Sequence, residues 1–119
     1  MAGMPIEMSR DRFEELVSDA LDEVPEGLLE LMDNVVVLVE EQNAEMPGIL
    51  GLYHGVALTS RTHDYSGVLP DRISIYRRPI LAMCQDEDQV VEEVLITVVH
   101  EIAHHFGIDD ARLHELGWG

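Results

Sequence analysis

The sequence predicts an α+β fold, in which helices flank a small sheet of about three strands. Apolar residues recur at helical spacing over residues 10–24 and 88–107, whereas residues 34–40 and 72–76 are short runs rich in valine or isoleucine. Hydrophobic residues make up 46% of the 119 residues, which is enough for one core. We therefore expect residues 1–119 to form a single domain.

Two helices are expected at the N-terminal end. Ser9 can cap a helix over residues 10–24, because its side-chain oxygen can accept a hydrogen bond from the first turn. Pro25 opens a second, short helix over residues 25–34, since proline suits the first turn of a helix. The apolar residues of the first helix recur at helical spacing and are Phe13, Leu16, Val17, Ala20, Leu21 and Val24.

Three strands are expected in the middle of the chain. Residues 34–40, with four valines and a leucine, form the first strand. Residues 42–55 are interpreted as a loop, because three glycines and a proline fall within them. Residues 56–60 are expected to form the second strand, and residues 62–70 a polar loop. Residues 72–76 alternate in polarity, which predicts a third strand with one buried face.

The part of the chain after the third strand is expected to be helical. Residues 77–79, two arginines and a proline, end the strand, and residues 80–84 add a helical turn. Asp86 or Asp88 then opens a long helix, since early acidic residues suit the helix dipole. Gly107 ends that helix, because glycine tolerates the left-handed conformation. Its expected apolar stripe consists of Val91, Val94, Leu95, Val98 and Ile102.

A His-Glu-x-x-His motif lies in the last turns of the long helix. Positions four residues apart differ by only about 40° around a helix. His100 and His104 therefore project from one face and can hold one zinc ion through ring nitrogens. Glu101 flanks that face, where it can reach a metal-bound water without being a ligand itself. A catalytic zinc ion needs one more protein ligand and an open position.

The third ligand is expected just after the helix. Gly107 allows a sharp turn that can bring a carboxylate, which is an acceptable zinc ligand, back toward the metal. Asp110 is the first choice, and Asp109 and Glu115 are the reserves. The tail, residues 108–119, is expected to contain one more short turn of helix.

The segment HEIAHHFGIDD, residues 100–110, resembles the zincin superfamily of metallopeptidases. More narrowly, the chain is similar to the small bacterial zincin-like metallopeptidases, which are minimal metzincin-like domains that carry HExxHHxGxxD. Two further segments agree with this similarity, ARLHELGW after the motif and DRISIYRRPI ahead of the long helix. The resemblance implies a compact zincin-like fold with zinc on His100, His104 and Asp110. It implies a zinc-dependent hydrolase of peptide bonds with Glu101 as the general base.

The chain departs from larger zincins in two respects. No methionine follows Asp110, so the methionine turn that metzincins place beneath the zinc is expected to be missing or to be supplied by upstream residues such as Met83. A chain of this length is also expected to lack the second subdomain of larger zincins. By analogy with zincins, whose substrates lie extended along a sheet edge, residues 73–76 are expected to be that edge.

Several other side chains invite a functional interpretation. His63, Tyr65 and His114 are candidate donors to the oxyanion of the reaction, although ordinary surface positions are the simpler interpretation. His105 points about 100° away from its metal-binding neighbour and is expected to pack or form a hydrogen bond. Cys84, the single cysteine, lies beside acidic residues and is interpreted as a small buried hydrophobic residue.

The net charge is −17, from 24 acidic residues and seven arginines. Such a surface repels phosphate backbones, so no nucleic-acid partner is expected, whereas a basic peptide or protein substrate would be attracted. A signal peptide is not evident, no apolar stretch reaches the ~20 residues of a membrane span, and the single cysteine argues against a disulfide-stapled secreted fold. We therefore expect a cytoplasmic protein without a membrane partner. The oligomeric state is not indicated.

Two other functions remain open at this point. A catalytically weak or inactive zinc-binding module could bind a basic partner through the acidic residues 11–26 and 86–93, with zinc as a staple. A zinc-dependent hydrolase of another class, such as an rRNA-maturation endoribonuclease, has a related metal helix. Those enzymes usually lack a glutamate at the position of Glu101, and they need a surface that tolerates RNA.

Overall fold

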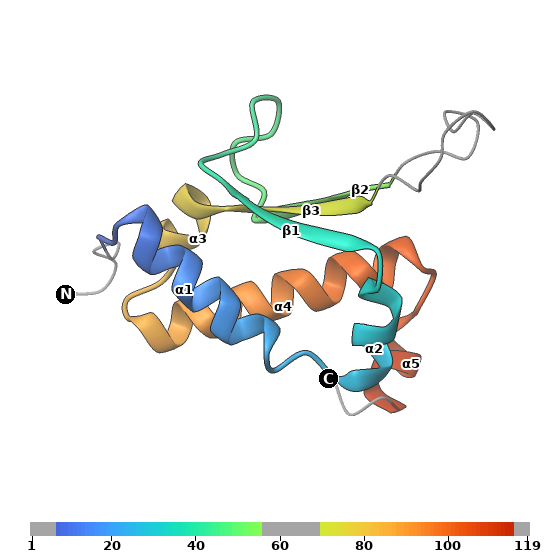
Figure 1. Cartoon of the computed structure of the whole chain (residues 1–119). Helices are drawn as coiled ribbons and strands as arrows, with labels where there is room; N and C mark the ends of the chain where they lie inside the picture. The colour runs from blue at the N-terminus through green and yellow to red at the C-terminus, as the bar shows by residue number, and fades with distance from the viewer. Residues whose placement is uncertain (1–6, 56–69, 116–119) are drawn as a thin grey trace.

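The protein has the predicted α+β architecture in its computed structural model, which describes residues 7–55 and 70–115 (Figure 1). The strands are Val35–Glu40 (β1), Gly51–His54 (β2) and Asp71–Tyr76 (β3). The helices are Arg10–Leu21 (α1), Glu26–Leu29 (α2), Arg77–Met83 (α3), Glu87–His105 (α4) and Asp110–Glu115 (α5), with a 3₁₀ turn at Glu30–Met32 (η1). The single domain expected over residues 1–119 stays a prediction.

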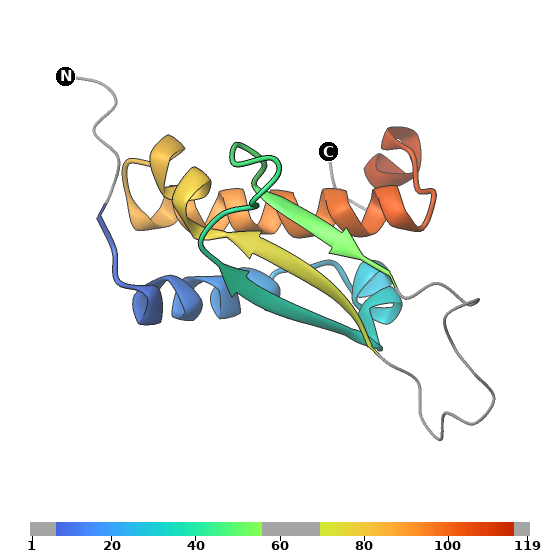
Figure 2. The same cartoon turned by 90° about the horizontal axis from the view of Figure 1, so that it is seen from above.

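β3 is the middle strand of the sheet. It pairs in parallel with β1 and antiparallel with β2, so the strand order is β1-β3-β2. α1 and α4 lie side by side under one face of this sheet (Figures 1 and 2). The prediction that residues 73–76 form a sheet edge is therefore wrong, because β3 has a hydrogen-bonded neighbour on both sides. Among the described strands, β2 pairs with β3 alone, and its other edge, here called the free edge, contacts α4.

β2 lies earlier in the chain than the second strand that the sequence predicts. Residues 42–55, expected to be a loop, contain β2, and the strand expected at residues 56–60 lies outside the described residues. Gly51 explains the error. A Cβ atom on Gly51 would lie 2.5 Å from Thr97 Cγ2 and 3.0 Å from the carbonyl oxygen of Ser74. The glycine therefore allows the strand to approach α4 closely, rather than marking a turn.

Side-chain caps begin both long helices, as the sequence predicts. Ser9 Oγ accepts a hydrogen bond from the N–H of Arg12 at 3.1 Å, and Asp86 Oδ1 accepts one from the N–H of Gln89 at 2.8 Å. α1 ends at Leu21, three residues before its predicted end. The chain turns there toward a proline, and the residue before a proline disfavours the helical conformation.

The segment predicted as one short helix over residues 25–34 forms α2 and then η1. α3 begins at Arg77, earlier than the turn expected at residues 80–84. This early start is possible because Pro79 falls in the first turn, where its missing N–H breaks no hydrogen bond within the helix. Cys84, which follows α3, is buried as predicted, and burial raises the pKa of its thiol to about 11.

The core lies between the sheet and the helices beneath it. The buried face of α4 is wider than the predicted stripe, because Val90, Thr97 and Val99 are buried while Val91 and Leu95 are only partly so. α4 contacts α1 on one side and β2 and β3 on another, so more of its surface is covered than one stripe. The largest fully buried side chains include Phe13, Leu28, Ile73, Ile75, Ile80 and Ile102.

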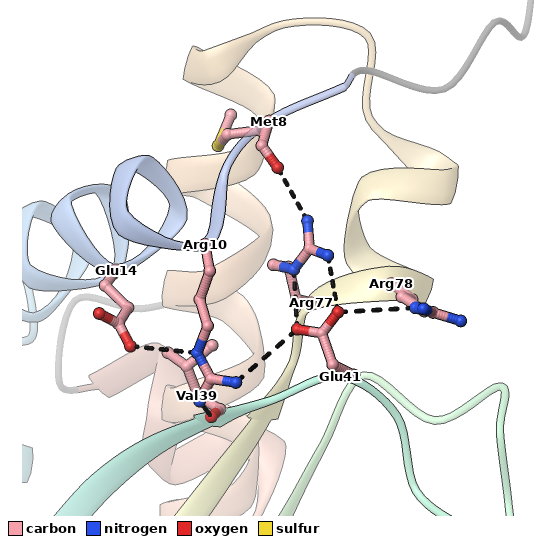
Figure 3. Close-up of polar contacts among 7 residues, drawn as sticks. All are labelled: Met8, Arg10, Glu14, Val39, Glu41, Arg77 and Arg78. Carbon is pink, nitrogen blue, oxygen red and sulfur yellow. Dashed lines mark hydrogen bonds and ion pairs between the residues drawn. The ribbon is translucent and has the colours of Figure 1, made fainter.

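An ion-pair cluster around Glu41 ties three segments together at the end of the sheet where α1 and α3 begin (Figure 3). The carboxylate of Glu41 accepts two hydrogen bonds from Arg77, at 2.6 and 2.9 Å, and lies within 4 Å of Arg10 and Arg78. Arg77 also donates to the carbonyl oxygen of Met8 at 2.8 Å. Chiefly because of the Arg77 hydrogen bonds, the pKa of Glu41 is lowered to about 2.

The close approach of β2 to α4 predicts that Gly51→Ala lowers the free energy of unfolding by about 1–3 kcal/mol, because the new methyl group overlaps Thr97. Thr97→Ser in the same chain should restore part of the loss, since it removes the clashing Cγ2 atom. Urea unfolding measures both effects. Gly48→Ala is the matched control, because a Cβ atom there meets nothing within 4 Å. Equal stability of the two alanine variants would contradict the packing argument.

The Glu41 cluster predicts a pH-dependent contribution to stability. Because folding lowers the pKa of Glu41 from 4.5 to about 2, its ion pairs stabilise the fold above pH 4.5 and lose this effect as the pH falls toward 2. The stability difference between wild type and Glu41→Gln should therefore shrink over that range in urea titrations. Glu45→Gln is the control, since no ion pair links Glu45 to another described residue. A difference that stays constant with pH would argue against the cluster.

Candidate metal centre

His100, Glu101 and His104 line one pocket near the C-terminal end of α4, as the motif predicts. The pocket has a volume of about 450 Å³, and its other lining residues are Ala103, Ile108 and Leu113. Both imidazoles are exposed, whereas the side chain of Glu101 is half-buried. Helix geometry places the two histidines one turn apart on one face, and they are exposed because the other faces of α4 are buried against the sheet and α1.

Gly107 terminates α4, as the sequence predicts. Its φ angle is +70°, in the left-handed region that favours glycine. The N–H of Ile108 donates to the carbonyl oxygen of Ala103 at 2.8 Å, and the N–H of Gly107 donates to that of His104 at 3.3 Å. These two bonds form a Schellman motif, which reverses the chain and leads it into α5. Buried Leu113 then packs α5 against the core, beside the histidines.

The two reserve candidates for the third ligand have other partners. Asp109 Oδ1 accepts a hydrogen bond from the N–H of Arg112 at 2.8 Å, so Asp109 caps α5. Glu115 forms an exposed ion pair with Arg112 at 2.9 Å. Asp110 is the first residue of α5, but its side chain lies outside the described part of the structure. Asp110 as the third ligand therefore stays a prediction.

Glu101 has a partner that the sequence did not indicate. Its Oε1 atom accepts a hydrogen bond from the main-chain N–H of Tyr53 in β2, at 2.9 Å. The ring of Tyr53 stacks on the imidazole of His105, with centroids 3.8 Å apart. The prediction that His105 packs is thereby confirmed. Tyr53 was missed because it lies in the segment interpreted as a loop, and no local pattern pairs it with a helix 48 positions later.

The other side chains to which the sequence suggested a role lie away from this pocket or outside the described residues. Met83 is 54% exposed at the end of α3 and does not line the pocket, so of the two alternatives that the sequence left open, Met83 as a replacement for the methionine turn is not supported. The apolar lining consists instead of Ala103, Ile108 and Leu113. His114 is exposed on α5 and is not a lining residue. His63 and Tyr65 lie outside the described residues.

Comparison with known proteins assigns the family. Residues 32–118 match the family described as Zincin-like metallopeptidase. The chain belongs to this family. The match includes α4, the two histidines and Glu101, and it agrees with the resemblance seen in the sequence. Proteins of the Zincin-like metallopeptidase family normally bind zinc.

A solved structure is also similar to this family member. It is described as a conserved hypothetical protein from T. thermophilus, with 26% sequence identity and a TM-score of 0.55. The similarity covers 83% of this chain and 94% of that protein. The comparison with curated proteins found no match. Within residues 7–55 and 70–115, no helix has the length and apolar character of a membrane span.

The donor set fits a zinc ion in part. Two exposed imidazoles one turn apart are suitable nitrogen ligands, and the pocket beside them has room for an ion and a substrate group. Among the side chains that the structure describes, no three His, Cys, Asp or Glu residues form a metal-binding group. The described part of the chain thus offers two candidate ligands, and Asp110 remains the expected third.

The pocket geometry predicts that His100→Ala weakens zinc binding by at least about 100-fold, because half of the imidazole pair is lost. His114→Ala should bind zinc as the wild type does, since His114 does not line the pocket. Titration of the metal-free proteins against a competing chelator measures both affinities.

The same titration identifies the third ligand. Asp110→Asn should lower the affinity for zinc, whereas Asp109→Asn should leave it nearly unchanged, because the asparagine oxygen can still accept the hydrogen bond from the N–H of Arg112 that caps α5. A wild-type protein that stays empty in excess zinc would exclude the metal site. The reverse ranking of the two asparagine variants would move the third ligand to Asp109.

Proposed function

We propose that this protein is a zinc-dependent peptidase in which Glu101 is the general base. The observation that carries the proposal is the pocket in which Glu101 stands beside His100 and His104. The half-buried carboxylate is held at one oxygen by the N–H of Tyr53, while the imidazoles remain exposed to an incoming ion. This arrangement provides metal ligands and a fixed base within one site.

Each residue of the site has a distinct role in the proposed reaction. His100 and His104 hold the zinc ion through ring nitrogens, and Asp110 supplies the third ligand. When bound, zinc polarises the carbonyl group of a peptide bond and lowers the pKa of water. Glu101 takes a proton from the attacking water and delivers it to the nitrogen of the leaving amine as the C–N bond breaks. The products are a carboxylic acid and an amine.

The substrate is proposed to be a basic peptide that lies along β2. β2 is the free edge strand beside α4, and an extended peptide can add to such an edge through the outward main-chain groups of β2 other than the N–H of Tyr53, which Glu101 occupies. The net charge of −17 favours peptides that carry lysine or arginine. Peptides with basic residues should therefore have a lower KM than acidic peptides of equal length, and added salt should reduce the difference.

Glu101→Gln tests the proposal, because it removes the base and keeps the shape of the side chain. The value of kcat for peptide cleavage should fall by about 100-fold or more, with the zinc content unchanged. Cleavage is measured on a mixture of basic peptides by mass spectrometry, with zinc content determined on the same samples.

Glu92→Gln is the matched control. Glu92 lies on the same helix, but it is exposed and does not line the pocket beside the histidines. Its variant should cleave peptides at the wild-type rate. Undiminished cleavage by Glu101→Gln at equal zinc content would end the proposal. Zinc binding without cleavage in the wild type would favour a zinc-binding module.

A further inference from the structure

The main-chain N–H of Tyr53 faces the free edge of β2. Tyr53 lies opposite Ile73 in the antiparallel pair of β2 and β3. The N–H of Tyr76 donates to the carbonyl oxygen of Leu50 at 2.9 Å, which marks a hydrogen-bonded pair three positions away. Because bonded and non-bonded pairs alternate along such a ladder, the pair of Tyr53 and Ile73 is non-bonded. The N–H of Tyr53 is therefore available to a group outside the sheet.

Glu101 is the group that uses this N–H. Its Oε1 atom accepts the hydrogen bond at 2.9 Å in a partly buried setting, where a bond to a carboxylate is stronger than one between neutral groups. Oε2 accepts no hydrogen bond from the described residues. The carboxylate is thus fixed through one oxygen, and the second oxygen stays available for a proton.

The ring of Tyr53 is anchored on three sides. It stacks on His105 at 3.8 Å, and Phe106 meets it edge-on at 6.1 Å between centroids. Its hydroxyl group donates to Asp71 Oδ2 at 2.7 Å. Two of these contacts come from the end of α4 and one from β3. They fix the main chain of β2 relative to the helix that carries Glu101.

We propose that Tyr53 is a positioning residue for Glu101, which it orients through its main-chain N–H, with its anchored ring holding that N–H in place. The inference rests on the proposed function, because it explains how the carboxylate of Glu101, the proposed general base, is oriented. A ring that only stabilised the fold would affect unfolding and leave the turnover of folded protein unchanged. A positioning residue lowers kcat in folded, zinc-loaded protein and changes KM little.

The hydrogen bond is tested first in zinc-free protein, by amide hydrogen exchange at single residues. Glu101→Ala should speed exchange of the Tyr53 amide by about 10-fold or more, because its acceptor is gone. The Leu52 amide is the internal control, since Leu52 lies in a hydrogen-bonded pair with Ser74 and should exchange at an unchanged rate. Equal exchange of the Tyr53 amide in the two proteins would overturn the inference, whatever the activity of the enzyme.

Three substitutions of Tyr53 then separate the ring from the N–H. Tyr53→Phe keeps the stack and the N–H, Tyr53→Leu keeps only the N–H, and Tyr53→Pro removes both. Proline is tolerated on an edge strand where the N–H faces outward. At equal zinc content, Tyr53→Phe should retain kcat within about 2-fold of the wild type, and Tyr53→Leu should lower kcat several-fold. Tyr53→Pro should lower kcat about 10-fold more than Tyr53→Leu does. KM should stay within about 2-fold throughout.

Equal kcat values for the folded leucine and proline variants would overturn the role of the N–H. If the proline variant does not fold, kcat of Tyr53→Phe is compared with kcat of Tyr53→Leu. Equal kcat values for these two variants would overturn the role of the ring. A wild-type protein that cleaves no peptide would contradict the proposed function instead. The exchange experiment would still report on the bond between Tyr53 and Glu101 in that case.

Discussion

The packing of α4 beneath the sheet is the constraint on which the rest of the structure depends. Val98, Val99 and Ile102 of this helix are fully buried, and they lie immediately beside the exposed histidines in the sequence. Each residue advances the helix by about 100°, so a small rotation of α4 would expose the valines and bury an imidazole. The apolar face therefore fixes the direction of His100 and His104. Gly51 makes this packing possible, because it lets β2 lie directly against Thr97.

The end of α4 shapes the pocket beside the histidines. The Schellman motif at Gly107 satisfies carbonyl groups of the last turn and reverses the chain. Asp109 then caps α5, whose Leu113 is buried against the core. Leu113 is thus a second apolar contact that brings the chain back to the end of α4. The pocket wall made by Ile108 and Leu113 is a consequence of this return.

Polar contacts are divided between the two ends of the sheet. The cluster of Glu41 and its arginines lies where α1 and α3 begin, at the end opposite α5 and the C-terminal end of α4 (Figure 1). Glu41 and Arg77 thus fasten the fold away from the site. Near the site, the contacts of Tyr53 link β2, β3 and the end of α4. The arginines of the Glu41 cluster do not line the pocket of His100 and His104.

Local patterns in the sequence were sufficient for much of this protein. Helical periodicity placed α1 and α4, and valine-rich or alternating runs marked β1 and β3. Ser9 marked the start of α1, whereas the start of α4 was open between Asp86 and Asp88 until the structure showed the Asp86 cap. The spacing of His100 and His104 predicted a shared face, because residues four apart on a helix always lie close together. These features depend on residues that are near one another in the chain.

Only the tertiary structure decided which strand has the free edge beside α4 and which group donates a hydrogen bond to Glu101. Gly51 resembles a turn residue until α4 is seen to occupy the space of its missing side chain. Tyr53 reaches Glu101 across 48 positions, through a main-chain group that carries no sequence signal. The sequence by itself determined the fold class, the long helix with its two histidines on one face, and the family. Strand order and the orientation of the base arise from contacts between distant segments, which no local pattern encodes.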